Sequence, residues 1–214
     1  MKGWQFTTTG VPLKMIEKAD PKAGPGEVVI DIKAAGLCHS DVGALEDPGW
    51  LDIITLRPLF LGHEFAGVIS EVGAGIKDFK IGDRVGVCPV GLGGTAPGYS
   101  RDGGYATKSV TPVEDLIRIP EHVSFAQAAA GTEADMSTLH AVKVQNRVTA
   151  GAKVGKIDIG SPVGTVSDIQ GIYDRFESGK LNPEIITITF GEIAEGLKEL
   201  KNQRVRGRLV ALIE

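Results

Sequence analysis

The sequence lacks the features of several protein classes. No apolar run approaches the roughly 20 residues that a membrane-spanning helix needs, so we expect no membrane segment. It has no basic run, and its 23 lysines and arginines are outnumbered by 27 aspartates and glutamates, so we expect no nucleic-acid partner. The N-terminal segment lacks the apolar core of a signal peptide, and we expect a cytoplasmic protein.

Cysteine and histidine are scarce. The chain of 214 residues has two cysteines, Cys38 and Cys88, and in a chain of cytoplasmic type such a pair is weak evidence for a disulfide. Of the four histidines, only His39 and His63 lie in a context that suggests chemistry. The search for a functional site therefore begins at the segments around Cys38 and His63.

Glycine, by contrast, is abundant. The 29 glycines and 11 prolines predict many turns between short strands. The strands that we expect first span residues 28–37, 65–72, 84–87, 105–110 and 116–120. Strands at this spacing favour a closed or partly open β-barrel.

Helical patterns begin after residue 120. A capped helix is expected over residues 124–142, and a second over 167–178 with Ser167 as its N-cap. A strand over 185–190, a helix over 192–201 and a final strand over 208–213 follow. The expected fold class is α+β and mainly β.

Two segments together supply plausible zinc ligands. Cys38 lies just past the end of one expected strand, and His63 and Glu64 lie just before another. A thiolate, an imidazole and a carboxylate are donors that Zn²⁺ prefers. Cys38 and His63 are too far apart in the sequence for a local zinc knuckle, so the fold must bring them together, as the strand ends of a barrel can.

Five motifs carry a resemblance to a known family. They are Gly36-Leu37-Cys38-His39-Ser40-Asp41; Gly62-His63-Glu64-Phe65-Ala66-Gly67 followed by Gly73 and Ile76; Gly82-Asp83-Arg84-Val85; Gly103-Gly104-Tyr105-Ala106; and Gly179-Lys180-Leu181 with Gly207-Arg208-Leu209-Val210. In these residues the chain resembles the zinc-containing medium-chain alcohol dehydrogenases over nearly its whole length. The resemblance implies the catalytic domain of that family, a GroES-like β-barrel with flanking helices.

The resemblance also implies a catalytic zinc that polarises a small alcohol or carbonyl compound. Cys38 and His63 would be zinc ligands, and Glu64 would be a close or exchangeable ligand. Ser40 would relay the proton of the alcohol. Asp41 would be a carboxylate that orients His63.

A further zinc ligand comes in this family from the helix after the barrel, where the family has a cysteine or an aspartate. The matching position here is Glu133, and Asp135 is the alternative. Apolar side chains near the motif could line a substrate pocket or belong to the ordinary core: Trp50, Leu56, Leu59 and Phe60.

The chain departs from the family in two places. A lobe with four closely spaced cysteines holds a structural zinc in the family, but this chain has only Cys88 there, so we expect no second zinc. The glycines of residues 155–164 do not have the Gly-x-Gly-x-x-Gly spacing of a dinucleotide site. We therefore expect a single domain, formed by residues 1–155 and 156–214, that lacks a Rossmann domain of about 100–150 residues at this junction. No cofactor-binding residues are expected, and NAD(P) should bind poorly.

Three functional hypotheses remain. The first is the zinc-binding catalytic domain of an alcohol dehydrogenase-like oxidoreductase, with weak or lost NAD(P)-dependent activity. The second is a hydrolase in which a zinc-bound water cleaves activated esters, and the third is a non-catalytic scaffold. Because relatives pair chiefly through the cofactor domain, we expect a monomer or an altered oligomer. The face left by that domain should be polar or used for self-association.

Overall fold

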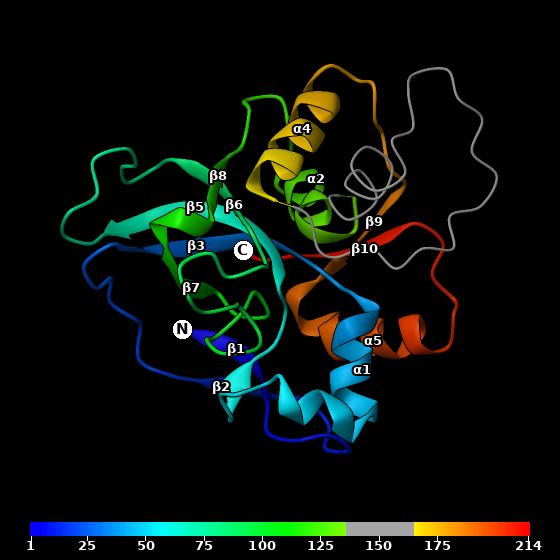
Figure 1. Cartoon of the computed structure of the whole chain (residues 1–214). Coiled ribbons are helices and arrows are strands. Elements are labelled where there is room, and N and C mark those ends of the chain that lie inside the picture. Colours follow the sequence, from blue (N-terminus) through cyan, green and yellow to red (C-terminus); the bar gives the residue numbers. More distant parts are fainter. Residues whose placement is uncertain (136–164) are drawn as a thin grey trace.

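The computed structural model describes residues 1–135 and 165–214 (Figure 1). The strands are β1 (Lys2–Phe6), β2 (Lys14–Glu17), β3 (Glu27–Gly36), β4 (Leu59–Phe60), β5 (Glu64–Val72), β6 (Arg84–Val87), β7 (Lys108–Pro112), β8 (Leu116–Arg118), β9 (Ile185–Thr189) and β10 (Arg208–Leu212). The α-helices are α1 (His39–Glu46), α2 (Phe125–Ala130), α4 (Val166–Glu177) and α5 (Ile193–Lys201). Short turns of 3₁₀-helix are η1 (Pro48–Asp52), η2 (Val113–Asp115) and η5 (Phe190–Glu192), and η3 (Gly131–Asp135) is a π-helical turn.

The strands form two sheets. The smaller has the order β2-β1-β4, and the larger has the order β8-β6-β5-β3-β10-β9, with β7 also paired to β3. Within the described part of the chain this order does not return to its first strand, so the larger sheet is open. The predicted α+β class is confirmed, and of the two predicted barrel forms the partly open one agrees with the strand pairing.

Strand β3 lies at the centre of the larger sheet. One edge of β3 pairs with β5, while the other edge pairs with β7 in its first half and with β10 at residues 34–36. Its β-branched residues Ile30 and Ile32 are fully buried, as expected for a strand enclosed on both sides. The last residues of β3 therefore pair with β5 on one edge and with the C-terminal strand β10 on the other.

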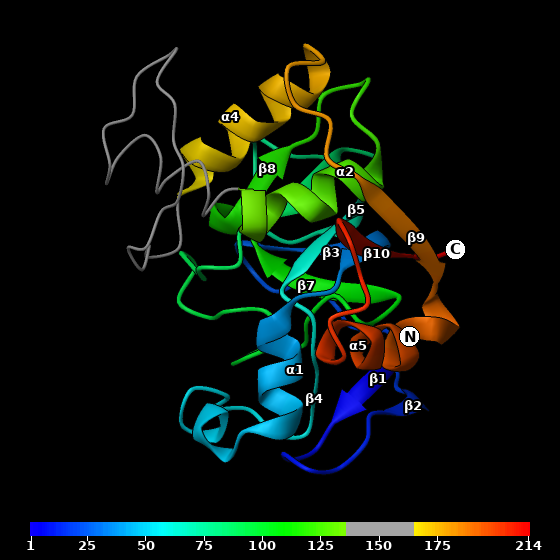
Figure 2. The same ribbon diagram turned by 90° about the vertical axis from the view of Figure 1, so that its right-hand side faces the viewer.

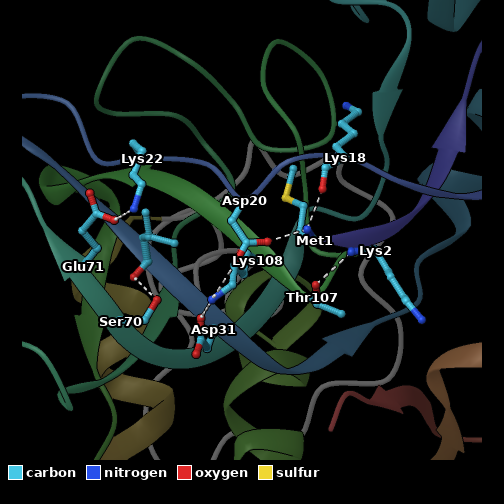
Figure 3. A network of polar contacts seen from close by, with 11 residues as sticks. Met1, Lys2, Lys18, Asp20, Lys22, Asp31, Ser70, Glu71, Thr107 and Lys108 are labelled. Carbon is cyan, nitrogen blue, oxygen red and sulfur yellow. Dashed lines mark hydrogen bonds and ion pairs between the residues drawn. The ribbon is translucent and has the colours of Figure 1, made fainter.

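Polar contacts join the loop before β3 to the sheet (Figure 3). Lys108 lies directly opposite Asp31 in the β3–β7 pair, and its Nζ is 2.6 Å from Asp31 Oδ1. Asp20 approaches the same ammonium at 3.8 Å, and Lys22 pairs with Glu71 at 3.3 Å. Opposite charges on facing residues support the strand register, although exposed pairs of this kind contribute little free energy.

Helices cover both faces of the larger sheet (Figures 1 and 2). α2 and α4 pack on one face, whereas α1, α5 and the smaller sheet lie on the other. The apolar face predicted for α4 is confirmed, because its members are buried: Ile169, Ile172, Tyr173 and Phe176. Among the helices of the described residues, none has the length and apolar character that crossing a membrane requires.

The start of α4 differs from the prediction. Thr165, not Ser167, is its N-cap. The Thr165 hydroxyl accepts the backbone N–H of Asp168 at 3.3 Å, and the Asp168 carboxylate accepts the Thr165 N–H at 2.9 Å. This reciprocal pair satisfies two helix-end N–H groups at once and so favours the earlier start.

Two other predicted elements have different limits. The strand expected over 105–110 begins at Lys108, because Tyr105 and Thr107 exchange backbone hydrogen bonds with β1 instead. α2 ends at Ala130 and continues as the π-helical turn η3. The rest of the helix predicted to residue 142, and the junction predicted at residues 155–164, lie outside the described residues.

Asp83 follows Gly82 in the turn between β5 and β6 and accepts two cationic side chains. Lys80 Nζ lies 2.8 Å from Oδ1, and Arg118 Nη1 lies 2.8 Å from Oδ2. The hydrogen bonds from Lys80, together with Arg118, outweigh the opposing effect of burial and lower the pKa of Asp83 to about 2.

Asp83→Asn is expected to lower the free energy of unfolding by about 1 kcal/mol at pH 7. The lowered pKa of Asp83 alone would correspond to roughly twice that free energy. Lys80 and Arg118 are largely exposed, however, so solvent screens their charges and reduces the contribution. Because the folded-state pKa lies below the unfolded value, the contribution is present above about pH 4 and is lost as pH falls toward 2. Urea unfolding of both proteins between pH 7 and pH 3 measures this, and a pH-independent difference would contradict it.

Candidate metal centre

The first turn of α1 holds three of the predicted site residues. Cys38 is the N-cap, two residues after the end of β3, and its backbone N–H donates to Asp41 Oδ2 at 3.3 Å. The Asp41 N–H in turn donates to the Cys38 carbonyl at 3.2 Å. These reciprocal contacts fix the thiol of Cys38, the hydroxyl of Ser40 and the carboxylate of Asp41 on one rigid turn.

The register of β3 and β5 brings the second segment to this turn. Gly36 is paired with Glu64, so Cys38, two residues beyond Gly36, lies beside His63. A side chain at position 36 would displace the Glu64 carboxylate, because its Cβ would overlap Glu64 Oε2 and lie 3.1 Å from the Glu64 Cβ. The glycine of the first motif therefore makes room for the carboxylate of the second.

The predicted metal ligands come together in space. One donor atom from each of Cys38, His63, Glu64 and Glu133 lies within 4.8 Å of the others. Glu133 comes from the π-helical turn η3, and its Oε2 is 3.7 Å from Cys38 Sγ. π-Helical turns of this kind occur often at functional sites.

The cluster is mostly shielded from water and contains two carboxyl groups, Glu64 and Glu133. His63 is 4% exposed and Glu64 is fully buried, whereas Cys38 and Glu133 are half-buried and leave one side open. Burial raises the pKa of Glu64 to about 7, although its ion pair with Arg208 opposes this shift. Burial alone would lower the pKa of His63, but the charge of Asp41, 3.5 Å away, raises it well above its usual value.

The donor set fits a zinc ion. Sulfur, nitrogen and carboxylate oxygen are all zinc ligands. Glu64 Oε1 is buried without a hydrogen-bond partner among the described residues, an arrangement that native structures seldom leave without a cation or water. Within residues 1–135 and 165–214 this is the one group of three or more potential ligands with such spacing. A divalent cation would also compensate the surplus of carboxylates.

Ser40 and Asp41 contact the two nitrogens of His63. Ser40 Oγ is 3.3 Å from Nε2, and Asp41 Oδ1 is 3.5 Å from Nδ1. The second oxygen of Asp41 accepts the hydroxyl of Tyr105 at 2.7 Å. The ring of His63 thus lies between a hydroxyl and a carboxylate, both from the first turn of α1.

The four apolar residues considered for a substrate pocket lie in different environments in the structure. Leu59 and Phe60 are fully buried in the core, and Leu56 is 43% exposed. Trp50 stacks on Tyr99 with ring centroids 6.3 Å apart, and the Tyr99 ring is 5.7 Å from that of His63. Only Trp50 therefore belongs to an aromatic group beside the candidate metal centre.

Three residues that contact members of the candidate site were missed in the sequence analysis. Tyr99, Tyr105 and Arg208 contact His63, Asp41 and Glu64 respectively. Tyr105 and Arg208 could have been suspected, because each lies in one of the five motifs, whereas Tyr99 had no comparable signal. Asp135, the alternative ligand, lies in η3, but its side chain lies outside the described part of the structure.

Comparisons with known proteins find alcohol dehydrogenases among the relatives of this chain. The alcohol dehydrogenase GroES-like domain matches residues 24–121. An alcohol dehydrogenase of Geobacillus stearothermophilus is 38% identical over 162 residues, covering 68% of this chain and 46% of the relative. The (R,R)-butanediol dehydrogenase of Bacillus subtilis is 31% identical over 166 residues, covering 68% and 47%.

The fold of this chain is also similar to that of solved alcohol dehydrogenases. The crystal structure of the alcohol dehydrogenase from the archaeon Aeropyrum pernix superposes with a TM-score of 0.85 at 17% identity, and the alignment spans 100% of both chains. The present chain spans about half the length of the curated relatives that it matches. With the domain match, the motifs and the shared fold together, the chain belongs to the zinc-containing medium-chain alcohol dehydrogenase family and carries its GroES-like domain.

Proposed function

We propose that this chain is the zinc-binding catalytic domain of an alcohol dehydrogenase-like oxidoreductase. The observation that carries the proposal is the convergence of Cys38, His63, Glu64 and Glu133 to within 4.8 Å. A zinc ion held there supplies Lewis-acid polarisation of a hydroxyl or carbonyl group. The proposed ligands are small alcohols and carbonyl compounds, in keeping with the names of the relatives.

The surrounding residues have separate tasks in this proposal. The half-buried hydroxyl of Ser40 accepts the proton of the alcohol and passes it toward solvent. Asp41 orients His63 through Nδ1. The rings of Trp50 and Tyr99 form an apolar wall beside His63 that excludes water from one side of the substrate.

We expect NAD(P)-dependent turnover to be weak. Hydride transfer needs a nicotinamide held in near contact with the substrate carbon, and residues 155–164 lack the glycine spacing that binds a dinucleotide. In this proposal residues 1–155 and 156–214 form a single cytoplasmic domain from which the cofactor domain has been deleted. The protein is then a monomer or an oligomer unlike that of its relatives, which gel filtration would test.

Metal analysis tests the proposed function. Protein purified without added chelator should contain one zinc per chain, and chelator-treated protein should take up one equivalent and melt at a higher temperature. In cobalt-substituted protein, an added aldehyde or alcohol should change the visible absorption spectrum. Absence of metal, together with no uptake on titration, would refute the proposal.

The open side of the cluster favours a second candidate activity. Because Cys38 and Glu133 are half-buried, water can reach the site, and a zinc-activated water could cleave activated esters. Zinc-dependent hydrolysis of 4-nitrophenyl acetate that disappears in Cys38→Ala would support this reading. A metal-free protein of high thermal stability, inactive in both assays, would instead support a structural role.

A further inference from the structure

Tyr105 is a fully buried tyrosine outside the ligand set. It lies far in the sequence from both segments that form the candidate metal centre. Its backbone contacts one of these segments, and its side chain contacts the other.

The backbone of Tyr105 is joined to the segment that precedes His63. Its N–H donates to the carbonyl of Leu61 at 2.9 Å, and the N–H of Gly104 donates to the carbonyl of Gly62 at 2.6 Å. The ring packs directly over Gly62, where an added Cβ would lie 2.5 Å from Tyr105 Cδ1. The φ angle of +88° at Gly62 also favours glycine, so the ring and this bend fit together.

The side chain of Tyr105 reaches the first turn of α1. Its hydroxyl donates to Asp41 Oδ2 at 2.7 Å, and the same oxygen accepts the N–H of Cys38 at 3.3 Å. With Oδ2 held by two donors, the other oxygen, Oδ1, faces Nδ1 of His63 at 3.5 Å, which is an ion-pair distance and longer than a hydrogen bond. A carboxylate fixed in this way selects the orientation of the imidazole and favours the tautomer with its proton on Nδ1.

We propose that Tyr105 is a positioning residue of the metal centre, which holds Asp41 so that His63 presents Nε2 for coordination. The inference rests on the proposed zinc site but concerns a residue that binds neither metal nor substrate. Tyr105 also sets the distance between the two ligand-bearing segments, because it contacts both. Its loss should therefore affect metal affinity much more than the loss of an ordinary buried hydroxyl.

A matched pair of variants tests the proposal. Tyr173 is also fully buried, and its hydroxyl donates to the carbonyl of Ala128 at 3.1 Å, away from Asp41. Tyr105→Phe and Tyr173→Phe each remove one buried hydroxyl donor, and Tyr105→Phe should cost somewhat more stability because its acceptor is a carboxylate. Only Tyr105→Phe should weaken zinc binding, by about 10- to 100-fold, and change the absorption spectrum of the cobalt-substituted protein. Unchanged affinity and spectrum, or an equal loss in Tyr173→Phe, would overturn the proposal.

A double-mutant cycle tests whether Tyr105 acts through Asp41. In an Asp41→Ala background the tyrosine hydroxyl has no carboxylate to hold, so Tyr105→Phe should change zinc affinity by less than about twofold. If Tyr105→Phe weakened zinc binding as much in the Asp41→Ala background as in the wild type, Tyr105 would not act through Asp41, and the proposal would be overturned.

A metal-free measurement separates this inference from the proposed function. The ring signals of the four histidines are recorded by NMR in metal-free protein, and His63→Gln assigns the one from His63. Tyr105→Phe should shift or broaden that signal, and Tyr173→Phe should leave it unchanged. If the wild type binds no zinc, the proposed function fails, but the NMR signal of His63 still tests the role of Tyr105. A changed His63 signal in Tyr105→Phe supports that role, and an unchanged signal overturns it.

Discussion

Replacing Cys38 by alanine is expected to weaken zinc binding by about 100- to 1,000-fold. Structural zinc sites bind with an apparent free energy of roughly 10–16 kcal/mol, so one of four donors accounts for roughly 3–4 kcal/mol, and about 1.4 kcal/mol corresponds to tenfold. Cys38 supplies the single sulfur of the cluster, and no other thiol lies within its donor set. Competition with a chelating dye at pH 7 measures the change.

The second cysteine provides the matched control. Cys88 is fully buried and lies outside the ligand cluster, so Cys88→Ala should keep the wild-type zinc affinity even if its stability falls slightly. His63→Gln should lose zinc as Cys38→Ala does, and circular dichroism would show that both variants are folded. Zinc affinity of wild-type strength in folded Cys38→Ala would show that the metal centre has been placed wrongly.

Asp115→Ala is expected to lower the free energy of unfolding by about 3–5 kcal/mol. Asp115 is fully buried, its Oδ2 lies 2.9 Å from Nη2 of Arg101, and its Oδ1 accepts the N–H of Gly93 at 3.2 Å. The side chain of Arg101 is only 12% exposed, so removal of the carboxylate leaves a buried guanidinium without its counter-charge. Urea unfolding at pH 7 measures the loss.

Two further variants show whether the loss comes from the buried charge. Arg101→Met combined with Asp115→Leu removes both charges and should recover more than half of the stability, because an apolar pair can replace a buried ion pair. Lys198→Ala breaks a pair with Glu195 in which both side chains are about two-thirds exposed, and it should cost less than about 0.5 kcal/mol. A loss below about 1 kcal/mol in Asp115→Ala would contradict the expected role of the pair.

Most strands and helices of the described chain were predictable to within a few residues, because β-branched runs and helix caps are local signals. The strand order was not. β10 lies between β3 and β9, and its pairing with residues 34–36 joins distant segments through core packing. The N-cap of α4 could not be placed either, since Ser167 and Thr165 share the local preference and the contact with Asp168 favours Thr165.

The candidate ligands could be proposed from two short motifs, because each motif combines a donor with the glycines that position it. Asp41 could be proposed from the first motif as well, but the long-range contacts that support the ligands could not. Tyr105 contacts Asp41 across 64 residues, and Arg208 contacts Glu64 across 144 residues. Such contacts depend on strand order and register, which local patterns do not encode.

The pairing of Gly36 with Glu64 has a consequence for folding. A slip of one residue between β3 and β5 would turn Glu64 to the opposite face of the sheet and move Cys38 along it by about 3.4 Å. A cation held from both segments could then no longer be bound. The metal would thus favour the correct strand register, because its binding free energy would stabilise only the chain in which Gly36 pairs with Glu64.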